Sequence, residues 1–222
     1  RTDLTVAVIT NGSLLYLPEM RHELLSADAV LPSLDAGNAR LYHKLNRPHP
    51  DITFNRLVQG LVAFRKEYQG KLWIEVMLIN GLNDTETALN EIAAVLRNIV
   101  PDEVHILLPE RPPVEPWVQP SDEEGLLRAR AILGDFARVI YPSSGSFSLS
   151  GAGSLLDAVI GIITRHPICE AELIGTLKHY APEEVSVTLE ELEKSGKAQV
   201  VERFGVRFWS ASLAHFPPGK CT

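Results

Sequence analysis

One stretch of this chain decides its fold: KLWIEVMLINGLND, residues 71–84. Apolar, β-branched and aromatic residues fill most of its first nine positions, a composition typical of a strand buried on both faces. Asn80-Gly81 predicts the end of the strand, and Thr85 suits the N-cap of a following helix. Glu75 stands out, because a buried carboxylate costs several kcal/mol unless it is paired or faces water. Two interpretations stay open: Glu75 points into a polar barrel mouth, or it forms a structural ion pair.

On both sides of this stretch, short apolar strands alternate with longer segments of helical periodicity. The pattern predicts further strands at residues 4–9, 29–34 and 104–108, and helices at 18–25, 38–45, 52–68 and 86–99. Strands separated by a helix are joined by crossover connections, which place them parallel in one sheet. The sequence therefore predicts an α/β domain with at least four parallel strands in chain order.

Polar residues and glycine follow the predicted strands at the points where they end. They include Asn11 after the first strand, Asp35 after the second, and Asn80, Gly81 and Asp84 after the third. In parallel α/β folds, ligands bind at the carboxyl ends of the strands. We therefore expect a binding site at this edge of the sheet. His105, inside the fourth strand, is either a satisfied core histidine or a group that faces a ligand.

Beyond the fourth strand, the composition changes. Residues 111–120 contain four prolines, which predicts an extended loop that serves as a linker or as a ligand clamp. A helix from Ser121 to about Phe136 and a short strand at 138–141 follow. The Ser/Gly-rich stretch from Pro142 to Gly153 indicates a domain boundary. We therefore divide the chain into an α/β domain at 1–142, a linker at 143–153, a second domain at 154–212 and a tail at 213–222.

The second domain has the pattern of a winged helix. Three helical segments at 154–165, 170–178 and 183–195 precede a hairpin at 198–210. From residue 151 onward there are seven Lys and Arg against nine Asp and Glu, a net charge of −2. The segment in the place of a recognition helix, 183–195, holds five of those acids, which would repel DNA phosphates. The charge favours protein contact over DNA binding for this domain.

Composition excludes several functional classes. The 222-residue chain carries a net charge of −7, which argues against a general nucleic-acid binder. Its two cysteines, Cys169 and Cys221, show no ligand spacing, so neither a disulfide framework nor a cysteine-rich metal site is expected. We expect no membrane span and no signal peptide, and a cytoplasmic protein. The chain starts at Arg1 and enters an apolar strand directly, which suggests a piece of a larger protein.

Several motifs resemble, in order and spacing, one group of radical S-adenosylmethionine (AdoMet, SAM) enzymes. They are Ile9-Thr10-Asn11-Gly12, residues 31–36 (LPSLDA), residues 45–48 (LNRP) and residues 72–84. The group is similar to the tRNA wyosine-synthesis enzymes and related iron–sulfur oxidoreductases, and the resemblance covers about residues 4 to 120. It implies an incomplete parallel TIM-type barrel: the family has six βα units, and this chain resembles its third unit onward, followed by the winged helix.

The resemblance also implies a cofactor site. Asn11, Ser33 and Asp35 would line the AdoMet pocket, the turn formed by Asn80, Gly81 and Asp84 would approach the adenine, and Glu75 and His105 would point into the barrel. The family holds a 4Fe–4S cluster on the cysteines of a CxxxCxxC loop, because such clusters need thiolate ligands. That loop and the glycine-rich turn for the methionine amino group are absent from this sequence. We expect no bound cofactor and no activity from this chain alone.

Two functions remain open. The first is a fragment of a radical AdoMet enzyme, which in full length would use the cluster and AdoMet to make a 5′-deoxyadenosyl radical that acts on an unidentified substrate, such as RNA or protein. The second is a non-catalytic α/β ligand-binding module with a winged-helix domain for protein interaction or regulation. The expected partners are an N-terminal segment or partner chain that completes the barrel, or a second copy bound at the exposed barrel edge. No residue is assigned a catalytic role.

Overall fold

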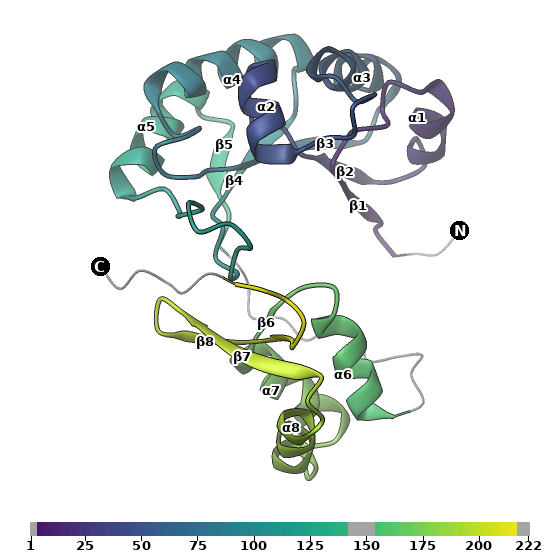
Figure 1. Ribbon diagram of the computed structural model, residues 1–222. Coiled ribbons are helices and arrows are strands. Elements are labelled where there is room, and N and C mark those ends of the chain that lie inside the picture. Colours follow the sequence, from purple (N-terminus) through teal and green to yellow (C-terminus); the bar gives the residue numbers. More distant parts are fainter. Residues whose placement is uncertain (1–3, 142–153, 217–222) are drawn as a thin grey trace. The chain divides into compact units, whose positions relative to one another are not determined.

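The computed structural model describes residues 4–141 and 154–216 and divides them into two compact units (Figure 1). The first unit comprises residues 4–108 and 119–141, and the second comprises 109–118 and 154–216. The proline-rich segment 109–118 thus groups with the second unit, whereas the sequence pattern placed it inside a continuous domain at 1–142. The expected linker, 143–153, and most of the expected tail lie outside the described residues.

The first unit is built on a five-stranded sheet. Its strands are β1 (Ala7–Thr10), β2 (Ala29–Pro32), β3 (Lys71–Met77), β4 (Glu103–Leu107) and β5 (Ala137–Val139). They lie in the order β1-β2-β3-β4-β5, and each neighbouring pair is parallel. The predicted parallel sheet in chain order is therefore confirmed. All five strands end at the same edge of the sheet, which brings the segments that follow them together.

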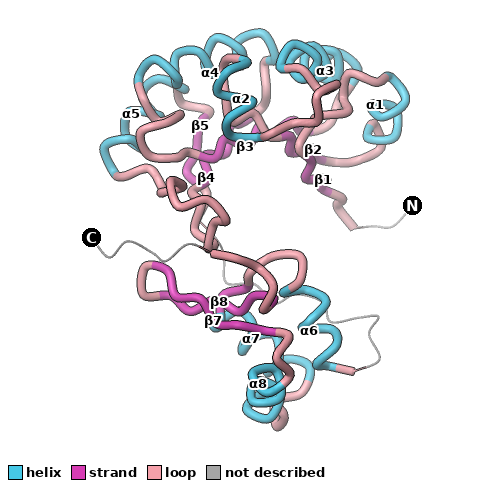
Figure 2. Tube along the Cα trace, viewed as in Figure 1, coloured by secondary structure: helices cyan, strands magenta, loops and turns pink. Residues whose placement is uncertain are grey.

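Five helices connect these strands and lie against one face of the sheet (Figure 2). They are α1 (Pro18–Leu24), α2 (Ala39–Asn46), α3 (Phe54–Glu67), α4 (Glu86–Ile99) and α5 (Glu123–Leu133). The side chains of Asn38, Thr53, Thr85 and Asp122 accept hydrogen bonds from backbone N–H groups and cap four of them. Such caps satisfy N–H donors that the first helical turn leaves without partners, so local sequence sets where each helix begins.

Burial on the strands alternates because side chains point to opposite faces of a sheet. Leu72, Ile74 and Val76 of β3 are fully buried in the core with the helices. Trp73 and Glu75 lie on the other face and are only partly buried. We call this opposite face the inner face, since it would line the interior of a barrel. The expectation that the strand at 71–79 is buried on both faces is thus wrong for β3, because the helices cover one face.

The second unit combines three helices with an antiparallel sheet. Its elements are α6 (Leu155–Ile163), β6 (Ile168–Cys169), α7 (Glu170–Tyr180), α8 (Val185–Lys194), β7 (Ala198–Arg203) and β8 (Val206–Ala211). The strand order is β6-β8-β7. Val159, Leu173, Leu192 and Trp209 are buried in its core. In the part of the chain that the structure describes, no helix is long and apolar enough to cross a membrane.

Candidate functional site

The strand register forms one polar row across the inner face. Ser33 pairs with Glu75 in an isolated parallel bridge beyond the end of β2. Glu75 is the register partner of His105 on β4, and His105 is the partner of Arg138 on β5. Adjacent strands lie about 4.8 Å apart, so each of these side chains has the next as a neighbour. The strand register thus places Ser33, Glu75 and His105, which the sequence indicated separately, in one row with Arg138.

Glu75 lies half-buried in the middle of this row. Its pKa is raised, first by desolvation and then by repulsion from the nearby carboxylate of Asp35. An ion pair would lower this pKa. Of the two interpretations drawn from the sequence, the raised pKa therefore favours a carboxyl group in a polar mouth over a structural ion pair.

Asp35 is fixed just beyond β2 by two hydrogen bonds to its carboxylate. The backbone N–H of Met77 donates to Oδ1 at 2.8 Å, and the side-chain amide of Asn46 donates to Oδ2 at 2.7 Å. Burial raises the pKa of Asp35, and these two hydrogen bonds oppose the rise. A carboxylate oxygen can accept more than one hydrogen bond. Asp35 is thus oriented by the protein and retains capacity to accept from a ligand hydroxyl or amine.

The turn after β3 is held together by Asn83, which is fully buried. Its side-chain amide donates to the carbonyl oxygens of Asp35, at 2.9 Å, and Met77, at 2.7 Å. Its Oδ1 accepts from the backbone N–H of Ile79 at 2.7 Å. One side chain therefore ties the end of β3, the segment after β2 and the turn into a single unit.

Asp84 is also buried, and its carboxylate is occupied by protein donors. The N–H of Gly81 donates to Oδ1 and the hydroxyl of Ser121 donates to Oδ2, each at 2.8 Å. Asp84 thus shapes the turn, whereas Asn80 and Gly81 are its exposed residues. Gly81 has a φ of 68°, the left-handed region in which glycine carries no side-chain penalty. The exposed part of this turn consists of backbone and the Asn80 side chain.

His105 lies in a small cluster on the inner face. Its Nε2 is 3.3 Å from Oε2 of Glu103, and its ring centroid is 5.3 Å from that of Trp73. Nε of Arg138 lies 3.5 Å from the same oxygen of Glu103. The side chain of His105 is 13% exposed, and that of Arg138 is 65% exposed. Glu103 and Arg138 were not among the residues that the sequence indicated, and only the register of β4 and β5 reveals them.

Asn11 follows β1 and is exposed. Its Oδ1 accepts from the backbone N–H of Ser13 at 3.0 Å, so it caps its own turn. The preceding residue, Thr10, is the register partner of Pro32. Asn11 therefore lies at the same carboxyl edge as Ser33, but its side chain is hydrogen-bonded within its own turn.

The donor set of the described residues does not fit an iron–sulfur cluster. Among residues 4–141 and 154–216, no group of three or more His, Cys, Asp or Glu side chains could hold a metal ion. Cys169 precedes helix α7 in the second unit, and Cys221 lies outside the described residues. A 4Fe–4S cluster needs several thiolates at one place.

Sequence relatives of the chain are about 30% identical to it. A protein named GTPase Obg, from Brachyspira hyodysenteriae, is 31% identical over 201 residues, which are 89% of this chain and 29% of that protein. A UPF0026 protein from Methanocaldococcus jannaschii is 30% identical over 60% of this chain and 41% of its own length. One from Helicobacter pylori is 31% identical over 74% of this chain and 53% of its own. The chain spans about half or less of these relatives, none of which is named for wyosine synthesis, and no family model matches it.

The chain is similar to two solved structures. A radical SAM methyltransferase from Sphaerobacter thermophilus has a TM-score of 0.51 and 27% identity, over 61% of this chain and 40% of that one. A domain of a pyruvate-formate lyase-activating enzyme from Bacteroides vulgatus has a TM-score of 0.48 and 19% identity, over 61% of this chain and 80% of that one. The parallel α/β sheet is consistent with part of a radical SAM TIM-barrel-like fold.

Proposed function

We propose that the first unit binds AdoMet at its carboxyl edge, as part of a radical AdoMet enzyme. The observation that carries the proposal is the similarity to the radical SAM methyltransferase, at 27% identity and a TM-score of 0.51. The polar row and the oriented carboxylate of Asp35 support it, since they lie where parallel α/β folds bind ligands.

Several groups at the edge have a role in this proposal. Asp35 accepts a hydrogen bond from a ribose hydroxyl or an amine of AdoMet, because its carboxylate is oriented and has free acceptor capacity. The exposed backbone at Asn80 and Gly81 borders the adenine. Ser33, Glu75 and His105 lie along the inner face and contact cofactor or substrate.

The cluster of such an enzyme does not belong to the described residues, so we assign them no step in the cleavage of AdoMet. A CxxxCxxC loop in another segment or chain would supply the thiolates. The bound cofactors of this class supply a radical that abstracts hydrogen from a substrate. The residues of this chain bind AdoMet, orient it and exclude water. A parent open reading frame without a CxxxCxxC motif would favour the non-catalytic ligand-binding module instead.

The name of the Obg relative does not extend GTP binding to this chain. Phosphate-binding P-loops have the sequence GxxxxGK[ST]. The three Gly-Lys pairs of this chain are followed by Leu72, Ala198 and Cys221 instead of Ser or Thr. This sequence therefore contains no P-loop motif.

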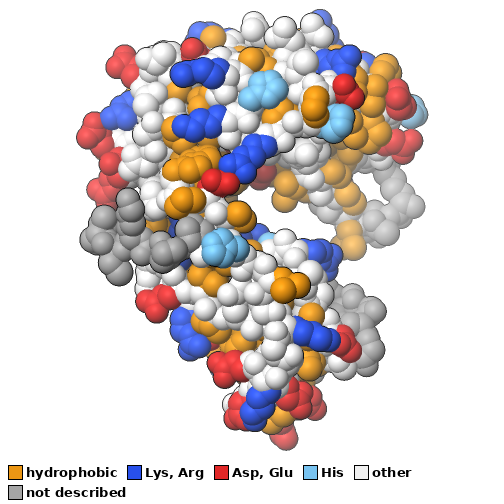
Figure 3. All heavy atoms as spheres, viewed as in Figure 1, with side chains coloured by type: hydrophobic (Ala, Val, Ile, Leu, Met, Phe, Trp, Pro, Cys, Tyr) orange, Lys and Arg blue, Asp and Glu red, His pale blue; other side chains and the backbone are white. Residues whose placement is uncertain are grey.

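For the second unit we propose a winged-helix module that contacts protein. The support is its element order, three helices followed by the β7–β8 hairpin with β6 as third strand. Acidic side chains gather over α8 (Figure 3), which includes Glu190, Glu191 and Glu193. Negative charge on this helix repels DNA phosphates and suits a basic protein surface. If this chain retards the migration of a DNA duplex in an electrophoretic mobility shift assay at physiological salt, the proposal is contradicted.

The AdoMet site is tested by titration of the full-length protein, reconstituted with iron and sulfide. We expect Asp35→Ala to lower the AdoMet affinity about tenfold, the effect of losing one charge-assisted hydrogen bond, with unchanged iron and sulfide content. Asp51→Ala is the matched control, because Asp51 is an exposed carboxylate in the loop after α2. Unchanged affinity in Asp35→Ala would remove Asp35 from the site.

A further inference from the structure

The proline-rich segment 109–118, which we call the strap, leaves and re-enters the first unit beside the end of β3. Just before the strap, the carbonyl oxygen of Leu107 accepts from the N–H of Leu78 at 2.9 Å. Just after it, the carbonyl oxygen of Gln119 accepts from the N–H of Asn80 at 2.9 Å. The flanks of the strap are therefore fixed to positions 78 and 80, two residues apart, at the start of the turn that carries Gly81.

The chain after the strap is bonded further into that turn. Pro120 and Ile79 form an antiparallel bridge. The Ser121 hydroxyl donates to Asp84, and Nη1 of Arg128 donates to the Asp84 carbonyl oxygen at 3.0 Å. Gly125 approaches this contact so closely that a Cβ there would collide with the Ser121 hydroxyl. The segment that follows the strap and the turn at 79–84 thus form one continuous network within the first unit.

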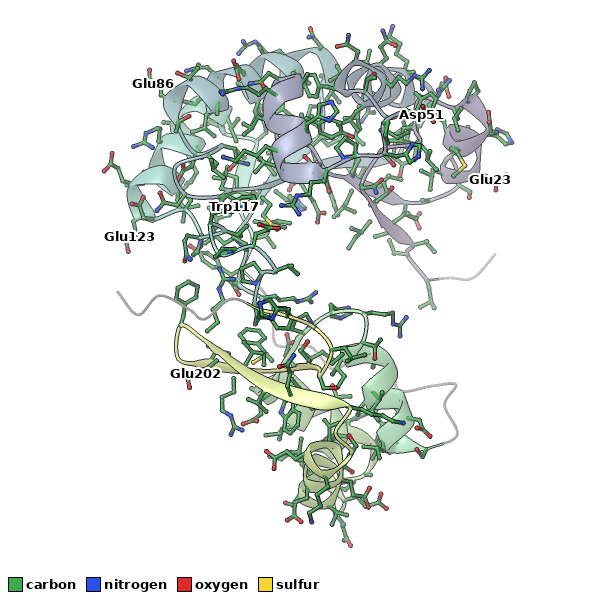
Figure 4. All side chains as sticks on the ribbon, viewed as in Figure 1. Glu23, Asp51, Glu86, Trp117, Glu123 and Glu202 are labelled. Atoms are coloured by element: carbon green, nitrogen blue, oxygen red, sulfur yellow. The ribbon has the colours of Figure 1, made fainter. Side chains whose placement is uncertain are left out.

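The strap itself is held by Arg203 at the end of β7, within the second unit. Nη1 of Arg203 donates to the carbonyl oxygen of Arg111 at 2.7 Å, and Nη2 donates to that of Val118 at 3.2 Å. Arg203 is only 8% exposed. A buried guanidinium needs acceptors, and these carbonyl groups lie 92 and 85 residues away in sequence. Figure 4 labels Trp117 on the strap and Glu202, the residue before Arg203.

We propose that Arg203 is a positioning residue for the turn at 79–84. Val118, which Arg203 holds, is joined by one peptide bond to Gln119, which holds Asn80. Fixing the strap thereby restrains the turn, and the state of the second unit sets how rigid the turn is. For the ligand this inference rests on the proposed function, in which the turn borders AdoMet, so binding to the second unit would alter AdoMet affinity.

Hydrogen exchange on this chain tests the restraint. We expect Arg203→Met to speed exchange about three- to tenfold in peptides covering 78–84, because a charge-assisted hydrogen bond pair is lost. Arg203→Lys should give an intermediate rate, since one ammonium cannot span both carbonyl groups. Arg207→Met is the matched control: Arg207 is a half-exposed arginine of β8 that pairs with Glu170 at 3.1 Å. Unchanged exchange at 78–84 in Arg203→Met would overturn the proposal.

A second variant decides the matter even if Arg203→Met unfolds the second unit. Insertion of Gly-Gly between Val118 and Gln119 keeps the bonds of Arg203 and loosens the link to Asn80. We expect this insertion to speed exchange at 78–84, and Arg203→Met to add nothing further to it. Equal exchange with and without the insertion would contradict the proposal. The variants could alter exchange at 78–84 as expected while the full-length protein binds no AdoMet. That result would support the restraint by Arg203 and contradict the proposed function.

Discussion

Glu75 and His105 are register partners on neighbouring parallel strands, so a carboxyl group with a raised pKa stands beside an imidazole on the inner face. Desolvation is the larger cause of the raised pKa, and the charge of Asp35 is the second. Both causes act against the ionised form in the folded protein. The row thus holds the carboxyl group of Glu75 at a cost in stability, which is typical of functional sites.

This cost predicts how stability depends on pH. A carboxyl group whose folded pKa is raised binds more protons when folded, so its charge destabilises the fold as pH rises above its ordinary value, about 4.3. Glu75→Gln should therefore raise Tm by about 1–3 °C at pH 7.5, a small shift because solvent screens Glu75, and should have no effect at pH 4. Glu103→Gln is the control, since Glu103 contacts His105 and Arg138. A Tm difference for Glu75→Gln that is equal at both pH values would count against this account.

Asn83 should be critical for the stability of the first unit. Its buried amide makes three hydrogen bonds to backbone groups. Asn83→Ala leaves those groups unsatisfied and should cost about 3 kcal/mol of unfolding free energy, measured by urea denaturation. Asn90→Ala removes an exposed bond to the Glu86 carbonyl oxygen and should cost under about 0.5 kcal/mol. Similar losses in the two variants would show that the Asn83 network is weak.

Substitution of Val100 by glycine should increase the stability of the first unit. This β-branched residue ends α4 with φ 57° and ψ 60°, in the left-handed region. The residue is 67% exposed, so little packing is lost when its side chain is removed. Val100→Gly should raise the unfolding free energy by about 0.5–1 kcal/mol, net of the greater flexibility of unfolded glycine. Val100→Ala should gain less, and a destabilised Val100→Gly would refute the strain at this position.

The free edge of β1 predicts self-association or capture of a further strand. In the order of the described sheet, β1 is terminal, and Leu4, Val6 and Ile9 are 76%, 47% and 72% exposed. Unpaired strand edges bearing apolar side chains associate readily. Light scattering on this chain should show dimers or larger species, and Ile9→Lys should shift them toward monomer. Leu127→Lys, a change at a 66% exposed leucine on α5, should not. A monodisperse monomer of the unchanged chain would contradict the prediction.

Local sequence predicted the elements of this fold well. Asn38, Thr53, Thr85 and Asp122 cap the helices that the apolar periodicity indicated, and the crossover argument gave the parallel order. Capping and periodicity depend on residues within one turn of each other, so they can be read without tertiary information. The sequence also showed that polar residues and glycine follow the strands.

Side-chain direction and long-range partners were not accessible. Asp84 lies at a strand end, yet it turns inward to Gly81 and Ser121, 37 residues away. Arg138 joins the row only through the register of β4 and β5. The strap groups with the second unit through Arg203, at a separation of 92 residues. Each of these depends on a distant segment, which a local pattern does not contain.

The position of the strap in the sequence also limits the order in which its contacts can form during synthesis. All five strands of the first unit and both flanks of the strap leave the ribosome before Arg203 does. The 85 residues between Val118 and Arg203 take roughly 5–15 s to translate. During that interval the carbonyl groups of Arg111 and Val118 do not yet have the guanidinium of Arg203 as a donor. If Arg203 restrains the turn as proposed, we expect the Gly81 turn to reach its final rigidity only after the β7–β8 hairpin has been made.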